Sequence, residues 1–374
     1  MIDRQRLMQT LLQYIDIQSA SYHEAPCAAQ IVQDLRALTY LNPQIEVDDV
    51  GAQCGSDTGN IYCKIQGDLD AEPLLFCAHM DTVNHGGVKI KAVVQGEEVQ
   101  SGSDTILSAD DKSGIAAILE ALRVIDEQKL PHRPIEVLFT VCEEVGLFGS
   151  KYADMRRFVS KCAIVPDSLG HAGNLIVRAP GQNRIYADIY GVAAHAGICP
   201  EEGVSAIAVG AEAISHMPLL RIDEETTANI GTFTAVGATN IVSPKARLEM
   251  EVRSRNAQKL EQYTARMVAC LEQSAQQYGA KVEISVEHTY APFALEEENA
   301  YVQMAIRACR ACDVPVALLS SGGGSDSNNF NQHGIVSFNI GSGMHAPHTT
   351  DETLNIAEFE GCARMMLHLM RAAQ

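Results

Sequence analysis

Apolar runs that end abruptly at polar residues alternate with segments of helical periodicity in the first half of the chain. The runs predict buried parallel strands, and the segments, with apolar residues three or four positions apart, predict amphipathic helices. We expect buried strands at 74–78, 135–142 and 162–168, a strand of alternating polarity at 60–67, helices at 3–19, 26–40 and 107–122, and a Gly/Asp/Ser-rich loop at 84–107. Such an alternation predicts an α/β fold with a parallel sheet, in which chemistry gathers at the carboxyl ends of the strands.

Acidic residues and a histidine stand at those strand ends. His79 and Asp81 leave the run at 74–78 on the same side, because strand side chains alternate between faces. A metal-binding histidine commonly donates its second ring N–H to a carboxylate, so Asp81 is a candidate orienting partner for His79. Alone, each further acid has an ordinary explanation as a helix cap or solvated side chain, but their convergence predicts a site for two divalent ions. The further candidates are Asp110 or Asp111, Glu143 or Glu144, Asp167, and His345 or His348.

The pattern changes after about residue 181. The order of the predicted elements is β-α-β-β-α-β, which is that of a small ferredoxin-like sandwich. Because the alternation of helices and strands resumes at 299, we expect a catalytic α/β domain formed by 1–180 and 291–374, with an α+β domain inserted at 181–290. The inserted strands are expected at 184–191, 228–237, 246–254 and 281–290, and the helices at 203–217 and 256–279.

Composition narrows the class of protein. The 374 residues are 46% hydrophobic and 20% charged, which is ordinary for a globular protein, and the length favours two domains. A formal net charge of −19, with no block of Lys or Arg, argues against nucleic acid and membrane partners. No apolar run reaches the ~20 residues of a membrane span, and the amino terminus does not resemble a signal peptide. The 11 scattered cysteines suit reduced thiols in a cytoplasmic protein.

A set of short stretches carries the candidate residues in a fixed order along essentially the whole chain. They are AHMDTV (78–83), SADDKSG (108–114), CEEVGLFGS (142–150), PDS (166–168), GVAAHAG (191–197), TNIV (239–242), GGGSDSNNF (322–330) and GMHAPHTTDE (343–352). Together they resemble the co-catalytic zinc exopeptidase family of peptidase T, aminoacylase and the glutamate carboxypeptidases, and most of all its peptidase T-like branch. The resemblance implies a phosphorylase/hydrolase-like dizinc α/β domain with an inserted lid and dimerisation domain. Ser108 and Pro166 depart from the usual pattern without removing a ligand.

The resemblance also implies a role for each candidate at the metal site. Asp81 would orient His79, and Glu143 would be the general base, which takes a proton from a metal-activated water and passes it to the departing amine. The metals would be two zinc ions, with cobalt or manganese as alternatives. The implied ligands are His79 and Asp167 for one ion, Glu144 and His345 for the other, and Asp110, joined to Asp111 by a cis peptide bond, as the bridge.

Residues of the predicted insert match family positions that contact the substrate. By the resemblance, His195 holds the developing oxyanion, and in dimeric members it reaches across from the partner chain. Asn240 and Arg253 match contacts to the substrate carboxylate, although a surface salt bridge is the alternative for Arg253. The glycines at 322–324, with Gly323 at their centre, would let backbone N–H groups approach the substrate.

These features predict a cytoplasmic, homodimeric exopeptidase that releases N-terminal residues from short peptides. The alternative is an N-acyl-amino-acid amidohydrolase with the same dizinc centre. An aminopeptidase must pair a free ammonium group, and the polar loops that contain Asp104 and Asp326 favour it. A catalytically silent homologue would have lost a ligand or Glu143, and a nucleotide-binding protein would need a lysine in its Gly-rich loop.

Overall fold

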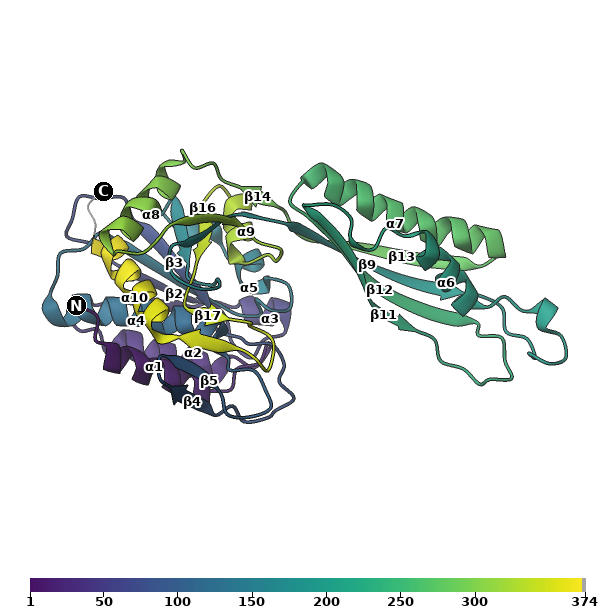
Figure 1. The fold of residues 1–374 in the computed structure, drawn as a ribbon, viewed down its shortest axis with the longest axis horizontal. Coiled ribbons are helices and arrows are strands. Elements are labelled where there is room, and N and C mark those ends of the chain that lie inside the picture. Colours follow the sequence, from purple (N-terminus) through teal and green to yellow (C-terminus); the bar gives the residue numbers. More distant parts are fainter. Residues whose placement is uncertain (372–374) are drawn as a thin grey trace. The chain divides into compact units, whose positions relative to one another are not determined.

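The computed structural model describes residues 1–371 and divides into two compact units (Figure 1). The large unit comprises Met1–Arg178, Leu295–Ser321 and the chain from Ser325 onward. The small unit comprises Ala179–Ala294 together with Gly322–Gly324. None of the described helices combines the length and the apolar character that crossing a membrane requires.

A mixed sheet forms the centre of the large unit. Its strands follow the order β1-β2-β6-β3-β7-β16-β8, with β15 beside β8. The neighbours β6, β3, β7 and β16 run parallel, whereas β2 and β8 pair with them in the antiparallel sense. The strands are β1 (Gln44–Val47), β2 (Ile61–Ile65), β3 (Leu74–His79), β6 (Ile135–Thr140), β7 (Cys162–Val165), β8 (Asn174–Ala179), β15 (Ala317–Ser320) and β16 (Val336–Ile340).

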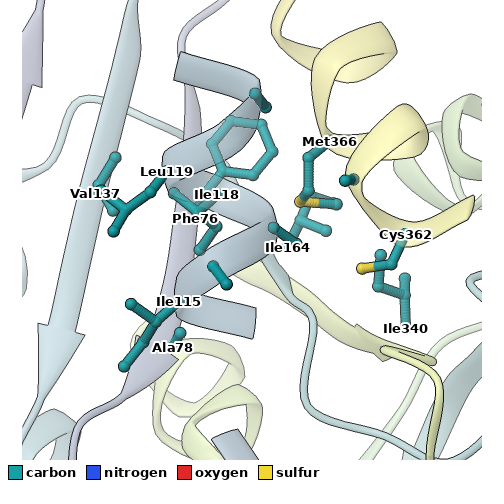
Figure 2. Close-up of a cluster of buried hydrophobic side chains, with 14 of the residues drawn as sticks. Phe76, Ala78, Ile115, Ile118, Leu119, Val137, Ile164, Ile340, Cys362 and Met366 are labelled. Atoms are coloured by element: carbon teal, nitrogen blue, oxygen red, sulfur yellow. The ribbon is translucent and has the colours of Figure 1, made fainter. Parts of the chain in front are cut away.

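Helices cover both faces of this sheet, which is why its central strands are continuously apolar. The helices are α1 (Arg4–Asp16), α2 (Ala25–Arg36), α3 (Val50–Cys54), α4 (Ala109–Gln128), α5 (Phe148–Tyr152), α8 (Ala300–Ala311), α9 (Asp326–Gln332) and α10 (Ile356–Arg371), with a 3₁₀ turn η1 (Met155–Arg157). Figure 2 shows Phe76 and Ala78 of β3 on the face that packs against α4, with Met366 of α10 nearby. The alternate residues Leu75 and Cys77 belong to the core on the other face, with Phe330 of α9.

A second, smaller antiparallel sheet in the large unit was not predicted. It has the order β17-β18-β5-β4, with β4 (Ala92–Gln95), β5 (Glu98–Ser101), β17 (Met344–His345) and β18 (Thr353–Asn355). The prediction of a loop throughout 84–107 is therefore wrong. The strand β4 is largely exposed and β5 is buried mainly through Val99, so neither carries the apolar run that marks a buried strand.

The small unit is a single antiparallel sheet with two helices on one face (Figure 1). The strand order is β10-β11-β12-β9-β13, and α6 and α7 pack on the apolar residues of β9 and β12. Asn256 caps the start of α7, and Gly279, with a φ of 68°, ends it. Its elements are β9 (Gly181–Tyr190), η2 (Pro200–Glu202), α6 (Ala206–His216), β10 (Leu220–Arg221), β11 (Thr226–Thr234), β12 (Lys245–Ser254), α7 (Ala257–Tyr278), β13 (Lys281–Tyr290) and β14 (Phe293–Ala294).

Candidate metal centre

His79 is the last residue of β3 and is almost fully buried. Its Nδ1–H donates to the backbone carbonyl of Asp81 at 2.9 Å, and its Nε2 therefore faces Asp110, 3.0 Å from Oδ1. The carboxylate of Asp81 lies farther from the ring, with Oδ1 3.5 Å from Nδ1. Asp81 thus orients His79 mainly through its carbonyl oxygen, and not mainly through its carboxylate as predicted.

The carboxylate of Asp81 instead fixes the turn that follows β6. It accepts the backbone N–H of Glu143 at 2.9 Å, that of Glu144 at 3.2 Å and the hydroxyl of Ser21 at 2.7 Å. Hydrogen bonds to a buried carboxylate stabilise its charge, and here they also hold two adjacent acids in place. Asp81 therefore connects the end of β3 to the acidic pair at the end of β6.

Two overlapping groups of potential ligands meet at these strand ends. The ligand atoms of His79, Asp110 and Glu144 lie within 4.8 Å of one another, and so do those of His79, Asp111 and Asp167. The peptide bond between Asp110 and Asp111 is cis, and both residues lie at the start of α4 with non-helical backbone angles. The side-chain amide of Asn339 donates to the carbonyl of Asp167 at 2.9 Å, which ties that acid to β16.

The late histidine at this centre is His348, which corrects the prediction of His345. The Nε2 of His348 lies 3.0 Å from Asp110 Oδ2 and 3.0 Å from Glu144 Oε1. His345 instead pairs with Glu358 of α10, at 2.8 Å between Nε2 and Oε2. His345 belongs to β17, which pairs with β18, and His348 lies in the loop between these strands. The sequence offers both histidines as candidates, and the family resemblance favours the first of them. The order of the two along the chain does not decide which side chain reaches the acids.

Burial and mutual repulsion dominate the electrostatics of the cluster. Burial raises the pKa values of Asp111, Glu143 and Asp167 well above their ordinary ranges, and neighbouring carboxylates raise them further. Burial also opposes ionisation of Asp110, but hydrogen bonds from His348 and His79 hold its pKa below the usual value. The same bond to Asp110, with one to Glu144, raises the pKa of His348 to about 10.

The donor set fits divalent cations. Carboxylate oxygens and imidazole nitrogens are the ligands that catalytic zinc sites use, and no cysteine is among the residues grouped here. The Oδ2 of Asp111 is buried without a hydrogen-bond partner in the part of the chain that the structure describes. Because several buried carboxylates share one crevice, bound cations would offset a charge that the protein otherwise concentrates there.

A cavity of about 960 Å³ adjoins Glu144 in the large unit. Ser21, which donates to Asp81, is among its lining residues, so the cavity borders the metal centre. Tyr22, Val83 and Val145 line it with apolar surface. The other lining residues are Gln18, Ala20, His23, Pro26, Asp57, Asn84, His85 and Gly87.

The two acids that were predicted to be available for a substrate ammonium group differ in their surroundings. Asp326 is buried, and it accepts hydrogen bonds from the hydroxyls of Thr140 and Ser150 and from the thiol of Cys77. Its carboxylate is therefore occupied by the protein itself. Asp104 is exposed in the loop that precedes Asp110.

The predicted substrate-binding residues belong to the small unit. His195 and Asn240 are both exposed. Their segments are adjacent, because His195 forms an isolated β-bridge with Ile241 and the N–H of Ala196 donates to the carbonyl of Asn240 at 2.9 Å. Arg253 is near the carboxyl end of β12, and its guanidinium donates twice to Glu251, at 2.8 Å and 3.1 Å.

Gly323 lies between β15 and α9 and is partly exposed. A side chain on the neighbouring Gly324 would meet the ring of Tyr290 at 2.3 Å, so glycine is required there.

Comparison with known proteins agrees with the motifs. The model of peptidase family M20/M25/M40 matches residues 75–372. The chain is 37% identical to the uncharacterized protein YqjE of Bacillus subtilis over 373 residues, which cover all of both chains. It is 28% identical to peptidase T of Vibrio cholerae over 275 residues, which cover 72% of this chain and 66% of that protein.

Solved structures agree in fold over nearly the whole length. The crystal structure of aminopeptidase PepT from Bacillus cereus has a TM-score of 0.88 and 36% identity, covering 99% of this chain and 98% of that chain. A tripeptidase from Staphylococcus aureus has a TM-score of 0.93 and 35% identity, with the same coverage. The resemblance and the fold class predicted from the sequence are confirmed. The chain belongs to peptidase family M20/M25/M40.

Proposed function

We propose that this protein is a metal-dependent aminopeptidase that releases the N-terminal residue of tripeptides. The observation that carries the proposal is the cluster of His79 with largely buried acids at the ends of β3, β6 and β7 and at the start of α4, with Glu143 among them. The similarity to an aminopeptidase PepT and to a tripeptidase, each covered almost completely, supports a short peptide as the substrate.

The proposed centre holds two divalent ions, most simply zinc. His79 and Asp167 would bind one ion, Glu144 and His348 the other, and Asp110 would bridge them. The contacts of Asp110 with both His79 and His348 support the bridging role. When bound, such ions lower the pKa of a water and polarise the scissile carbonyl.

Glu143 is the proposed general base. Its carboxylate takes a proton from the attacking water as the new C–O bond forms, and returns that proton to the amine as the C–N bond breaks. Asp81 supports this role because its carboxylate holds the backbone N–H of Glu143 at 2.9 Å. The backbone N–H of Glu144 donates to the same Asp81 carboxylate at 3.2 Å, so Asp81 fixes the backbone of Glu144 and leaves its side chain to the proposed metal ion.

The cavity beside Glu144 is the proposed site for a substrate side chain. Its volume of about 960 Å³ is ample for a side chain, and its Tyr22, Val83 and Val145 surface suits an apolar one. Because Asp326 is engaged by hydrogen bonds within the protein, the ammonium group of the substrate must find another acceptor, and Asp57, which lines this cavity, is a candidate.

We further propose that the small unit is a lid and dimerisation domain and that His195 acts on the substrate of a partner chain. The strand between Lys245 and Arg253 spans roughly 26 Å at ~3.3 Å per residue. His195 and Asn240 lie beyond the Lys245 end of that strand. One tripeptide therefore does not reach His195 and Arg253 of the same chain, and contacts with both require two copies. The free state of all 11 cysteines supports a cytoplasmic location.

The direct test is hydrolysis of trialanine by protein stripped with a chelator and then given back Zn²⁺, Co²⁺ or Mn²⁺. We expect no release of alanine from the stripped protein and recovery with at least one ion at two equivalents per chain. Undiminished turnover after verified metal removal would overturn the proposal.

A further inference from the structure

Glu352 is a buried acid whose carboxylate accepts hydrogen bonds from backbone N–H groups. Its side chain is 1% exposed, and its two oxygens accept the N–H groups of four consecutive residues. Oε2 accepts from Leu107 at 2.7 Å and from Ser108 at 2.9 Å, and Oε1 accepts from Ala109 at 2.8 Å and from Asp110 at 3.2 Å. Hydrogen bonds from N–H groups to a carboxylate are stronger than those between neutral groups.

These N–H groups require an outside acceptor. Ser108 has a φ of 70°, and Asp110 and Asp111 have non-helical backbone angles, so the segment from Leu107 to Asp110 does not make regular helical hydrogen bonds. The first N–H groups of a helix also lack partners within it. A buried N–H without a partner is costly, and Glu352 supplies the partners at the point where the chain delivers Asp110.

Glu352 also belongs to the segment that carries His348. Both lie between the ends of β17 and β18, and the N–H of Glu352 closes a turn on the carbonyl of Thr349 at 3.3 Å. One carboxylate therefore joins the segment with His348 to the segment with Asp110. The contact between His348 Nε2 and Asp110 Oδ2, at 3.0 Å, lies where these two segments meet.

We propose that Glu352 is a positioning residue that sets the separation of Asp110 and His348 and thereby the affinity of the metal site that they share with Glu144. The inference rests on the proposed metal-dependent function. Glu352 touches neither substrate nor metal, and acts only through the backbone before Asp110 and through the turn that presents His348.

The chemistry of the contact predicts how substitutions behave. Glutamine has one accepting oxygen, so Glu352→Gln loses about half of these hydrogen bonds and points an NH₂ group at N–H donors. Glu352→Asp keeps the charge but is one methylene shorter, so it should restore part of the wild-type behaviour. Asp351→Asn is the matched control, because Asp351 is the exposed neighbour and the substitution removes the same charge.

The experiment titrates chelator-stripped proteins with Co²⁺ alone, followed by calorimetry and visible absorbance. Hydrogen exchange of the 107–110 amides is measured in the same stripped proteins. We expect two ions in wild type, at least about tenfold weaker binding of one ion in Glu352→Gln, an intermediate affinity in Glu352→Asp, and wild-type binding in Asp351→Asn. The 107–110 amides should exchange faster in Glu352→Gln than in Asp351→Asn.

The failure of this inference is distinguishable from failure of the proposed function. Wild-type protein that bound no Co²⁺ would overturn the proposed function and this inference with it. Two ions in wild type with unchanged affinity in Glu352→Gln would overturn the inference alone. If Glu352→Gln does not fold, Glu352→Asp decides the matter, because wild-type affinity in that variant with altered amide exchange would also overturn the inference.

Discussion

Replacing His348 and His345 separately by alanine tests which of the two histidines belongs to the metal centre, the point on which the structure differs from the sequence-based prediction. The two histidines make a matched pair, because they are three residues apart and their side chains are about equally exposed, at 49% and 48%. His348 contacts Asp110 and Glu144, whereas His345 contacts Glu358 of α10. The structure therefore predicts that only His348→Ala disturbs the metal site.

The expected magnitudes differ clearly. Loss of a partner that merely orients a ligand typically costs 10–100-fold in metal affinity, so loss of the ligand itself should cost at least about 100-fold, or about 2.8 kcal/mol. His345→Ala removes an exposed pair, which is worth ~0.2–1 kcal/mol of folding stability and nothing in metal affinity.

Metal analysis after dialysis, with chelator competition for the affinity, measures the effect. We expect about one ion per chain in His348→Ala and two in His345→Ala. Turnover of trialanine should fall in His348→Ala and stay near the wild-type rate in His345→Ala. Loss of an ion from His345→Ala together with two tightly bound ions in His348→Ala would refute the assignment.

Further predictions concern the base, the partner chain and pH. Glu143→Gln should lower kcat by ~10²–10⁴-fold while both ions stay bound, as checked by kinetics and metal analysis, and loss of both ions would make Glu143 a ligand instead. Mixing His195→Ala chains with Glu143→Gln chains should restore part of the activity if His195 acts across a dimer, and no recovery after verified subunit exchange would place it within its own chain. The hydrogen bond from Lys259 lowers the pKa of Asp223 from 3.8 to about 2, so this bond stabilises the fold above about pH 3.8 and is lost as pH falls toward 2. The difference in Tm between wild type and Asp223→Asn, small because the pair is partly exposed, should therefore shrink from pH 6.5 to pH 2.5, and a difference independent of pH would contradict this.

The sequence predicted best those parts of the fold in which burial forces a pattern. The run 74–78 is apolar on both faces because helices cover both sides of the sheet, so β3 and the position of His79 at its end follow directly. Glu143 and Glu144 could be placed for the same reason after β6. Their separate roles stay predictions.

Other features depend on contacts between distant segments, which leave no periodic signal. His345 and His348 stand in the same polar stretch, and only the pairing of β17 with β18 decides which side chain reaches Asp110. Glu352 looks like an ordinary loop acid, because its partners at 107–110 lie more than 240 residues away along the chain. The exposed strands β4 and β5 were missed because one-sided, polar strands lack an apolar run.

Comparison of a free-amine tripeptide with its N-acetylated form tests the aminopeptidase proposal most directly. Trialanine and N-acetyl-trialanine would be given to the protein loaded with two equivalents of Zn²⁺, and kcat/KM measured for each by loss of the intact peptide. Chromatography of the products would separate alanine, released by an aminopeptidase, from acetate, released by an amidohydrolase. Acetylation removes the ammonium charge and leaves its acceptor unpaired, at a cost of ~1–3 kcal/mol or more. We predict a kcat/KM at least about tenfold lower for the acetylated peptide. Equal or faster hydrolysis of N-acetyl-trialanine would contradict the aminopeptidase and favour the amidohydrolase.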